Sequence, residues 1–265
     1  MTGRVLVVAG SDSGGGAGVQ ADIKTITALG GYAATAITAL TAQNTQQVNQ
    51  IDWVDPAFVA QQMQVVLDDI GADVIKLGML GSAETIVKVA SVIASLSPQP
   101  LTIVDPVLVA TSGDALAGDE TVTALKQHIL PTTYLLTPNL PEAEALTGLP
   151  TDTADELLAV GDALLAMGPK NVLLKGGHGR GDELVDVLFT GDDVVRFPGE
   201  RIESRNTHGT GCTLASAIAV SLAQGLTLTD AIKCARDYVR KAIRTAPGLG
   251  SGHGPLNHGH PLQNG

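Results

Sequence analysis

Short apolar runs alternate with helix-patterned segments along the chain, and this alternation restricts the possible folds more than any other feature. The apolar runs cover residues 5–9, 32–40, 73–77, 101–104, 134–137 and 171–175. Runs of this kind, bounded by glycine and polar residues, are typical of buried strands. Strands that alternate with helices predict right-handed βαβ units and a mostly parallel sheet with helices on both faces.

The pattern changes once, in the second half of the chain. Residues 184–190 and 194–197 flank a Gly191-Asp192-Asp193 turn, which predicts a β-hairpin at one edge of the sheet. No linker, low-complexity block or change of composition divides the chain. We therefore expect a three-layer α/β/α fold with a mostly parallel central sheet, in one domain spanning residues 1–265.

Composition and charge narrow the class of protein. Hydrophobic residues make up 44% of the chain and aromatic residues only 3%, so the core must consist of aliphatic side chains. The net charge of −11 argues against nucleic acid or an anionic membrane as a partner, but it allows an anionic substrate at a locally positive site. The two cysteines lack metal-type spacing, and the sequence shows neither a signal-peptide pattern nor a membrane-length apolar stretch. We expect a cytoplasmic protein.

Polar or glycine-rich clusters follow the predicted strands. These clusters are residues 10–18, 43–44, 78–81, 105, 139–142, 175–179 and 206–212. In a parallel sheet the carboxyl ends of the strands meet at one edge, and α/β proteins bind their ligands there. The sequence therefore predicts that all of these clusters line one crevice.

The last cluster lies in the motif Asn-Thr-His-Gly-Thr-Gly-Cys-Thr at 206–213, which runs into an apolar helix. A glycine-rich turn at a helix N-terminus presents unpaired N–H groups and the positive end of the helix dipole, which suits an anion. The same field would lower the pKa of the Cys212 thiol. The alternative is an ordinary loop in which Cys212 is a small hydrophobic residue.

Residues 10–18 also form a glycine-rich loop between a predicted strand and a helix. The loop fails the dinucleotide pattern, because Val19 stands where the third glycine is required, and no Gly-Lys-Ser/Thr follows it. It either offers backbone donors to a ligand or is a flexible turn. Gln43 and Asn44 lie just past the next strand; an amide can pair with a heterocycle that has adjacent donor and acceptor groups, or it can be solvated in a loop.

Carboxylates and a lysine follow the later strands. Asp105 is either a metal ligand or a cap, and Asn139 with Glu142 either hold hydrated Mg²⁺ or form a capping box. Lys175, beside glycines, suits contact with phosphate. The C-terminal tail carries three histidines that could bind metal, but we expect a mobile loop there: His253, His258 and His260.

Seven motifs, in this order, resemble one known family. They are Val-Ala-Gly-Ser-Asp-Ser-Gly-Gly-Gly-Ala-Gly at 8–18, Thr-Ala-Gln-Asn-Thr at 41–45, Lys-Leu-Gly-Met-Leu at 76–80, Val-Asp-Pro-Val at 104–107, Thr-Pro-Asn-x-x-Glu-Ala at 137–143, Lys-Gly-Gly-His at 175–178 and the motif at 206–213. The chain resembles, over nearly its whole length, the bacterial hydroxymethylpyrimidine/phosphomethylpyrimidine kinases of thiamine biosynthesis, in the ribokinase-like superfamily. The superfamily's Gly-x-Gly-Asp is Gly-Thr-Gly-Cys here, which points to the pyrimidine kinases or their vitamin B6-kinase relatives.

The resemblance implies a ribokinase-like fold and a specific reaction. ATP, with Mg²⁺, would phosphorylate 4-amino-5-hydroxymethyl-2-methylpyrimidine and then phosphorylate its monophosphate. The family also suggests a homodimer. A pyridoxal kinase or a dual-specificity enzyme is the alternative on the same scaffold. A non-catalytic nucleotide or vitamin sensor is disfavoured by the intact polar residues, and an NAD-dependent oxidoreductase by the failed glycine pattern.

The resemblance also assigns residues to roles. Gln43 matches the pyrimidine-binding glutamine, and four other positions match the lining of that pocket: Gly10, Asp22, Met79 and Val107. Three positions match contacts to the nucleotide, with Asn139 also supporting the metal: Lys175, Asn139 and Thr207. Asp105 and Glu142 match the carboxylates on the magnesium side.

The motif at 206–213 carries the implied catalytic residues. Gly209, Thr210 and Gly211 match an anion hole for the transferred phosphoryl group. Cys212 matches the proposed base for the hydroxymethyl group, although a thiolate is a modest base for an alcohol. The last helix departs from the family's pattern, since Arg236 stands in place of a lysine and keeps its charge with a different geometry. Residues 111–118 are a candidate lid.

Overall fold

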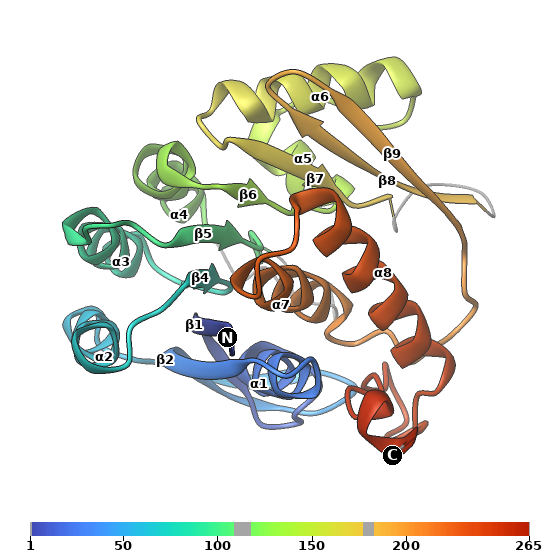
Figure 1. Cartoon of the computed structure of the whole chain (residues 1–265), viewed down its shortest axis with the longest axis horizontal. Helices are drawn as coiled ribbons and strands as arrows, with labels where there is room; N and C mark the ends of the chain where they lie inside the picture. The colour runs from blue at the N-terminus through green and yellow to red at the C-terminus, as the bar shows by residue number, and fades with distance from the viewer. Residues whose placement is uncertain (1, 109–117, 177–182, 265) are drawn as a thin grey trace.

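A nine-stranded sheet with helices on both faces forms the centre of the molecule (Figure 1). The computed structural model describes residues 2–108, 118–176 and 183–264. The strand order is β3-β2-β1-β4-β5-β6-β7-β8-β9. The strands are β1 (Arg4–Asp12), β2 (Tyr32–Gln43), β3 (Val48–Trp53), β4 (Val74–Leu77), β5 (Leu101–Val104), β6 (Leu135–Leu136), β7 (Asn171–Leu174), β8 (Glu183–Thr190) and β9 (Val194–Glu200).

The central strands are parallel, and antiparallel strands extend the sheet at each edge. β2, β1, β4, β5, β6 and β7 pair in parallel, whereas β3 is antiparallel to β2. At the other edge, β8 is antiparallel to both β7 and β9. The predicted three-layer fold and its hairpin are therefore confirmed, while the second antiparallel pair, β2–β3, was not anticipated.

Helices cover the two faces of the sheet unequally. On one face, α1 (Gly18–Ala28), α7 (Thr210–Ala223) and α8 (Leu228–Arg244) enclose a buried cluster with β1 and β4 (Figure 1). The other face packs against five helices: α2 (Pro56–Asp69), α3 (Ala83–Ser95), α4 (Asp119–Ala124), α5 (Leu140–Thr147) and α6 (Ala154–Ala166). The helix that begins at Asp119 is α only to Ala124, then continues as a π-helical turn (Leu125–Ile129) and a 3₁₀ turn (Leu130–Thr132).

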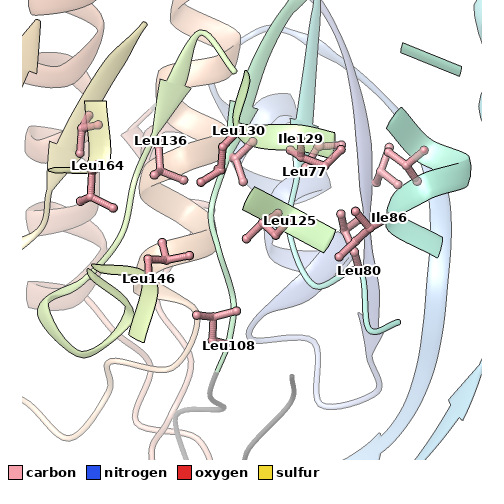
Figure 2. Close-up of a cluster of buried hydrophobic side chains, with 14 of the residues drawn as sticks. Leu77, Leu80, Ile86, Leu108, Leu125, Ile129, Leu130, Leu136, Leu146 and Leu164 are labelled. Carbon is pink, nitrogen blue, oxygen red and sulfur yellow. The ribbon is translucent and has the colours of Figure 1, made fainter. Parts of the chain in front are cut away.

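Period-two alternation distributes the aliphatic residues between two cores. On β1, Leu6 and Val8 face the α2/α3 side, whereas Val5 and Val7 face α7. Both sets are buried, as expected for parallel strands covered on both faces. Figure 2 shows the first core, where Leu77 and Leu136 lie among leucine and isoleucine side chains of the surrounding helices. A core of this kind holds the carboxyl ends of the strands in fixed register.

Side-chain caps start α2, α3 and α8. Asp55 accepts hydrogen bonds from two backbone N–H groups at the start of α2, with Pro56 as the first helical residue. Ser82 caps α3 in the same way, and Thr227 caps α8. Among the described residues, no helix is both long enough and apolar enough to cross a membrane.

Two strands are longer than predicted, and this moves site residues onto the sheet. β1 extends to Asp12, so Gly10 and Asp12 belong to the strand and only residues 13–17 form the loop. β2 extends to Gln43 because β3 pairs with it, so Gln43 is the last residue of a strand, not part of a loop. The candidate lid at 111–118 lies outside the described residues except for Gly118.

The C-terminal tail is packed against the protein, so the prediction of a mobile loop is wrong. His258 and His260 are buried, and the Tyr238 hydroxyl donates to the His258 carbonyl at 2.7 Å. The tail also contacts the loop after β2, where the His253 N–H donates to the Thr45 carbonyl at 2.8 Å. Burial lowers the pKa of His258 to about 4, so its imidazole is neutral near pH 7.

Candidate active site

A cavity of about 760 Å³ lies at the carboxyl ends of the parallel strands. Each of the polar clusters found in the sequence contributes at least one residue to its wall. One lining residue from each cluster is Gly10, Gln43, Met79, Asp105, Glu142, Lys175 and Cys212. The prediction that these separated segments line one crevice is confirmed, because the parallel strands all end at this edge.

Lys175 and two carboxylates form a charged centre in the cavity wall. Lys175 Nζ lies 2.7 Å from Asp105 Oδ1 and 3.8 Å from Glu142 Oε2. Burial opposes the charge of Lys175, but the two carboxylates outweigh it and raise its pKa above the ordinary value. Burial also raises the pKa of Glu142 to about 7, partly offset by Lys175. This centre combines a cation for phosphate with oxygen ligands for a hard metal ion.

Glu142 has a structural role as well as a place in the cavity. Its carboxylate accepts the Asn139 N–H at 2.8 Å, and the Asn139 side chain accepts the Glu142 N–H at 2.8 Å. The capping box at the start of α5 is therefore confirmed. Within the described residues, no cluster of three or more His, Cys, Asp or Glu side chains is placed to hold a metal. The donor set of Asp105, Glu142 and Asn139 fits a hydrated Mg²⁺, which keeps several of its water ligands.

The first turn of α7 lies directly against this charged centre. A Cβ atom on Gly211 would lie 3.3 Å from both Asp105 Oδ2 and Lys175 Nζ. Gly209 adopts φ +83°, and a side chain there would collide with the Gly16 carbonyl of the first glycine loop. The two glycines therefore allow the helix start to approach the charged centre on one side and the loop after β1 on the other.

Cys212 faces the cavity from the same turn, above a buried ion pair. Lys76 Nζ lies 3.0 Å from Asp22 Oδ2, and neither side chain has any exposed surface. Burial raises the pKa of the Cys212 thiol to about 11, although Lys76 and the Gly18 N–H favour the thiolate. The expectation of a lowered pKa is wrong, because loss of hydration outweighs the helix N-terminus and Lys76. Cys212 is a neutral thiol at pH 7.

Three of the other residues predicted to line the pyrimidine pocket do line the cavity, and Asp22 does not. Gly10 packs against the Met79 side chain, which a Cβ on Gly10 would displace. Met79 and Val107 both line the cavity. Asp22 does not, because its carboxylate is fully buried and bonded to Lys76 and to Ser216 Oγ at 2.6 Å. The prediction that Asp22 lines the pocket is therefore wrong.

An ionised carboxylate and a histidine connect the first glycine loop to Gln43. Asp12 accepts the N–H groups of Gly14, Gly16 and Ala17 at 2.8 to 3.0 Å, and it lies 2.8 Å from His208 Nε2. Burial opposes its charge, but these hydrogen bonds lower the pKa of Asp12 below the ordinary value. The Gln43 amide lies 3.4 Å from His208 Nε2.

Residues of α8 and of the segment after β9 also line the cavity. Val239 and Ile243 of α8 contribute apolar surface to the wall. Arg236 Nε donates to Asp186 Oδ2 at 2.8 Å, and the guanidinium carbon lies 5.7 Å from the centre of the Phe197 ring. The cavity wall therefore combines a polar amide, a charged centre and an apolar surface on α8, the helix that also carries Arg236.

Comparison with known sequences decides the family. The sequence model of the phosphomethylpyrimidine kinase family matches residues 12–257. The chain belongs to this family. It is 46% identical to the hydroxymethylpyrimidine/phosphomethylpyrimidine kinase of Rhizobium meliloti, with 98% of each chain covered. It is 52% identical to the thiamine biosynthesis bifunctional protein of Geobacter sulfurreducens over 97% of this chain, and it spans about half, 52%, of that longer protein.

Solved structures support the same assignment of fold. A phosphomethylpyrimidine kinase from Clostridium difficile is 37% identical, with a TM-score of 0.81, over 91% of this chain and 100% of that one. The pyridoxal kinase of Bacillus subtilis, solved as an ADP complex, is 31% identical, with a TM-score of 0.90, over 100% of both chains. The fold is that of the ribokinase-like vitamin kinases.

The structure brings together nearly all residues that the resemblance to phosphomethylpyrimidine kinases implied. Those that line the cavity are Gly10, Gln43, Met79, Asp105, Val107, Asn139, Glu142, Lys175, Thr207, Gly209, Thr210, Gly211 and Cys212. Sequence reasoning missed Lys76 and Asp12, and gave His208 no role. For Asp12 and His208, the only signal in the sequence was a histidine within a glycine-rich turn. For Lys76, its place near the end of an apolar strand did not indicate that its side chain is buried.

Proposed function

We propose that this protein uses ATP to phosphorylate 4-amino-5-hydroxymethyl-2-methylpyrimidine to its monophosphate and then to its diphosphate, in thiamine biosynthesis. One observation carries the proposal. A single cavity joins the Gln43 amide, which suits an aminopyrimidine, to the Lys175–Asp105 centre and the start of α7, which suit a phosphoryl group. Membership of the phosphomethylpyrimidine kinase family supports the substrate class.

In the proposed reaction, the hydroxymethyl oxygen forms a bond to the γ-phosphorus of ATP as the bond to the β–γ bridging oxygen breaks. ADP leaves, and the hydroxyl proton passes to solvent. Lys175 and the N–H groups of Gly211 and Cys212 lie where they can stabilise charge on the transferred group. Mg²⁺, when held by Asp105 and Glu142, would neutralise charge on the phosphates.

In this proposal Cys212 positions the substrate and does not act as a general base. Its pKa of about 11 leaves it protonated near pH 7. Phosphoryl transfer needs little help from a base, so a neutral thiol can position the hydroxymethyl group beside the anion hole. Replacing Cys212 by alanine is expected to remove most of the turnover while the pyrimidine still binds; near-normal activity would exclude the residue from the mechanism.

The same site accounts for two successive phosphorylations. The first acceptor is a hydroxyl and the second is the phosphate that it has received. The glycine turn at residues 209–211 and Lys175 can hold an acceptor phosphate as well as a transferred one. We infer that the pyrimidine shifts along the cavity between the two phosphorylations. Gln43 contacts the pyrimidine ring during the first of them.

A second candidate is a pyridoxal kinase or a dual-specificity enzyme. It is favoured by the 31% identity to the Bacillus subtilis pyridoxal kinase over the whole chain. The deciding experiment supplies ATP and Mg²⁺ with the pyrimidine, its monophosphate or pyridoxal, and follows products by mass spectrometry. The proposal requires pyrimidine diphosphate. Phosphorylation of pyridoxal alone would establish the second candidate.

We further propose a single-domain, cytoplasmic homodimer with no nucleic-acid partner. Two features support a dimer: the outer edge of β3 is the end of the sheet, and Leu40 and Trp53 on the β2–β3 pair are about half exposed, at 50% and 47%. The free cysteines, Cys212 and Cys234, are compatible with a reducing compartment. Analytical ultracentrifugation tests the dimer, and a monomer at micromolar concentration would exclude it.

A further inference from the structure

His208 Nε2 must carry a hydrogen atom. It lies 2.8 Å from Asp12 Oδ2, and an ionised carboxylate can only accept hydrogen bonds. Both the neutral Nε2–H tautomer and the imidazolium ion satisfy this requirement, and in neither does Nε2 keep a free lone pair. The neighbouring atom of the Gln43 amide, 3.4 Å from Nε2, therefore cannot donate to it. Only the amide oxygen is compatible with that position.

Thr41 is compatible with this orientation at the other side of the amide. Its Oγ1 lies 3.0 Å from the Ser11 carbonyl oxygen and 3.1 Å from the other terminal atom of the Gln43 amide. A hydroxyl has one hydrogen to donate and lone pairs with which to accept, so Thr41 can donate to Ser11 and accept from an amide nitrogen. The contact with His208 requires the orientation, and Thr41 accommodates it.

The structure places Gln43 Nε2 toward His208 and Oε1 toward Thr41. Amide oxygen and nitrogen are similar in size, so hydrogen-bond partners decide which is which. A half-turn of the amide exchanges them and removes the conflict at His208 without moving another atom, while Thr41 donates to Ser11 instead of to Gln43. With this exchange, Gln43 accepts weakly from His208 and donates to Thr41.

We propose that His208 is a positioning residue: held by Asp12, it fixes the Gln43 amide with its oxygen toward the start of α7 and thereby sets how an aminopyrimidine ring lies in the cavity. His208 and Asp12 are both buried and both line the cavity. The ring of His208 is itself confined, because Gly16 packs closely against it and the His208 backbone pairs with Pro255. The Asp12–His208 pair is thus rigid enough to impose one orientation on the half-buried amide.

The consequence for the substrate rests on the proposed pyrimidine-kinase function. A glutamine amide that pairs with the N3–C4 edge of the pyrimidine donates to N3 and accepts from the 4-amino group. The 5-hydroxymethyl group is adjacent to the 4-amino group, so it lies on the oxygen side of the amide. With the oxygen toward His208, the hydroxymethyl group points to the α7 turn that carries Cys212. The reverse orientation would point it away.

Nuclear magnetic resonance of the full-length protein without substrate tests the amide orientation. We expect ¹⁵N shifts that report a hydrogen on His208 Nε2, and nuclear Overhauser effects from the Gln43 side-chain amide protons to the Thr41 methyl group. The Gln43→Glu variant identifies the amide resonances by their loss. An unprotonated His208 Nε2, or contacts of the amide protons with the His208 ring in place of Thr41, would overturn the proposal.

Two His208 variants test the effect on catalysis. The amide nitrogen of His208→Gln can occupy the position of Nε2 and donate to Asp12, whereas His208→Leu removes the donor. We expect His208→Leu to lower kcat at least about tenfold while the Kd of the pyrimidine changes by less than about threefold, because both ring orientations still bind. His208→Gln should restore kcat to within about threefold of the parent protein.

A merely structural role predicts a different result. Loss of packing alone would weaken pyrimidine binding and lower thermal stability, and the glutamine variant would not restore kcat; that pattern overturns the proposal. If His208→Leu does not fold, the resonance experiment on the unchanged protein still decides the matter. A parent protein that fails to phosphorylate the pyrimidine would refute the proposed function, but the orientation of the amide would remain separately measurable.

Discussion

Lys76 Nζ contacts both carboxylate oxygens of Asp22, at 3.0 and 3.1 Å, in a position with no exposed surface. Burial opposes the charge of Lys76, but Asp22 and other nearby acidic groups outweigh it and keep its pKa above the ordinary value. Ser216 completes the network by donating to Asp22 at 2.6 Å. Because Ser216 lies one turn after Cys212 on α7, this ion pair supports the helix start that forms the anion hole.

Breaking this pair is expected to destabilise the fold strongly. Replacing Lys76 by methionine leaves the Asp22 charge buried without its partner, and such changes cost about 3–5 kcal/mol. Urea unfolding measures the loss. The double variant Lys76→Met/Asp22→Asn should recover much of it, because asparagine is neutral and can still accept from Ser216.

A surface pair provides the matched control. Lys233 lies 3.5 Å from Asp230 on α8, with both side chains more than half exposed. Lys233→Met should leave the urea midpoint unchanged, because exposed ion pairs contribute little. If Lys76→Met is as stable as Lys233→Met, then the buried pair does not hold the α7 start in place.

Gly211 is expected to matter for catalysis rather than for stability. Alanine is favoured over glycine in a helix, so Gly211→Ala should not lower the free energy of unfolding. The added methyl group, however, would crowd Asp105 and Lys175 at 3.3 Å. We expect kcat to fall at least about tenfold. Gly191→Ala is the control, since a Cβ there meets nothing within 4 Å; equal activity in both variants would contradict the prediction.

The reactivity of Cys212 should keep rising with pH well above neutrality. Its pKa is raised to about 11 by burial, so the reactive thiolate increases about tenfold per pH unit below that value. Alkylation by iodoacetamide in a Cys234→Ser background isolates this thiol, and mass spectrometry follows the rate. A rate that levels off below pH 9 would show that the helix N-terminus has activated the cysteine after all.

The tail should affect the acceptor end of the cavity. A Cβ on Gly252 would collide with the Thr45 carbonyl, in the loop that follows Gln43. We expect Gly252→Ala to raise the KM for the pyrimidine more than the KM for ATP. Gly259→Ala is a control in the same tail, because its Cβ would lie 3.8 Å from Asn257 Oδ1, an ordinary contact. Equal effects on the two KM values would indicate general destabilisation.

Patterns local in sequence predicted the fold well. Apolar runs determine the strands over short distances, and the structure confirms strands in all six predicted runs. β3 was missed because half of its six residues are polar, and Asn49, Gln50 and Asp52 interrupt the apolar pattern of a strand. Its pairing with β2 also explains why Gln43 belongs to a strand.

Contacts between distant residues were not predictable in the same way. Whether Lys76 or Asp22 is exposed depends on α1, β4 and α7 meeting, which no local pattern encodes. The pKa of Cys212 was predicted in the wrong direction for the same reason: the helix N-terminus is visible in sequence, whereas the depth of burial is not. For Glu142, the capping box with Asn139 could be predicted because the two residues are three apart in sequence. Its 3.8 Å contact with Lys175 could not, because it joins distant parts of the chain.

The Asp12–His208 contact joins residues 196 positions apart, and the Thr45–Gly252 contact spans 207 positions. Closing loops of this length costs conformational entropy before any contact compensates for it. The amide end of the cavity therefore belongs to the last part of the molecule to assemble. In a refolding experiment, helical circular dichroism should return first, and the capacity to bind the pyrimidine should lag behind it.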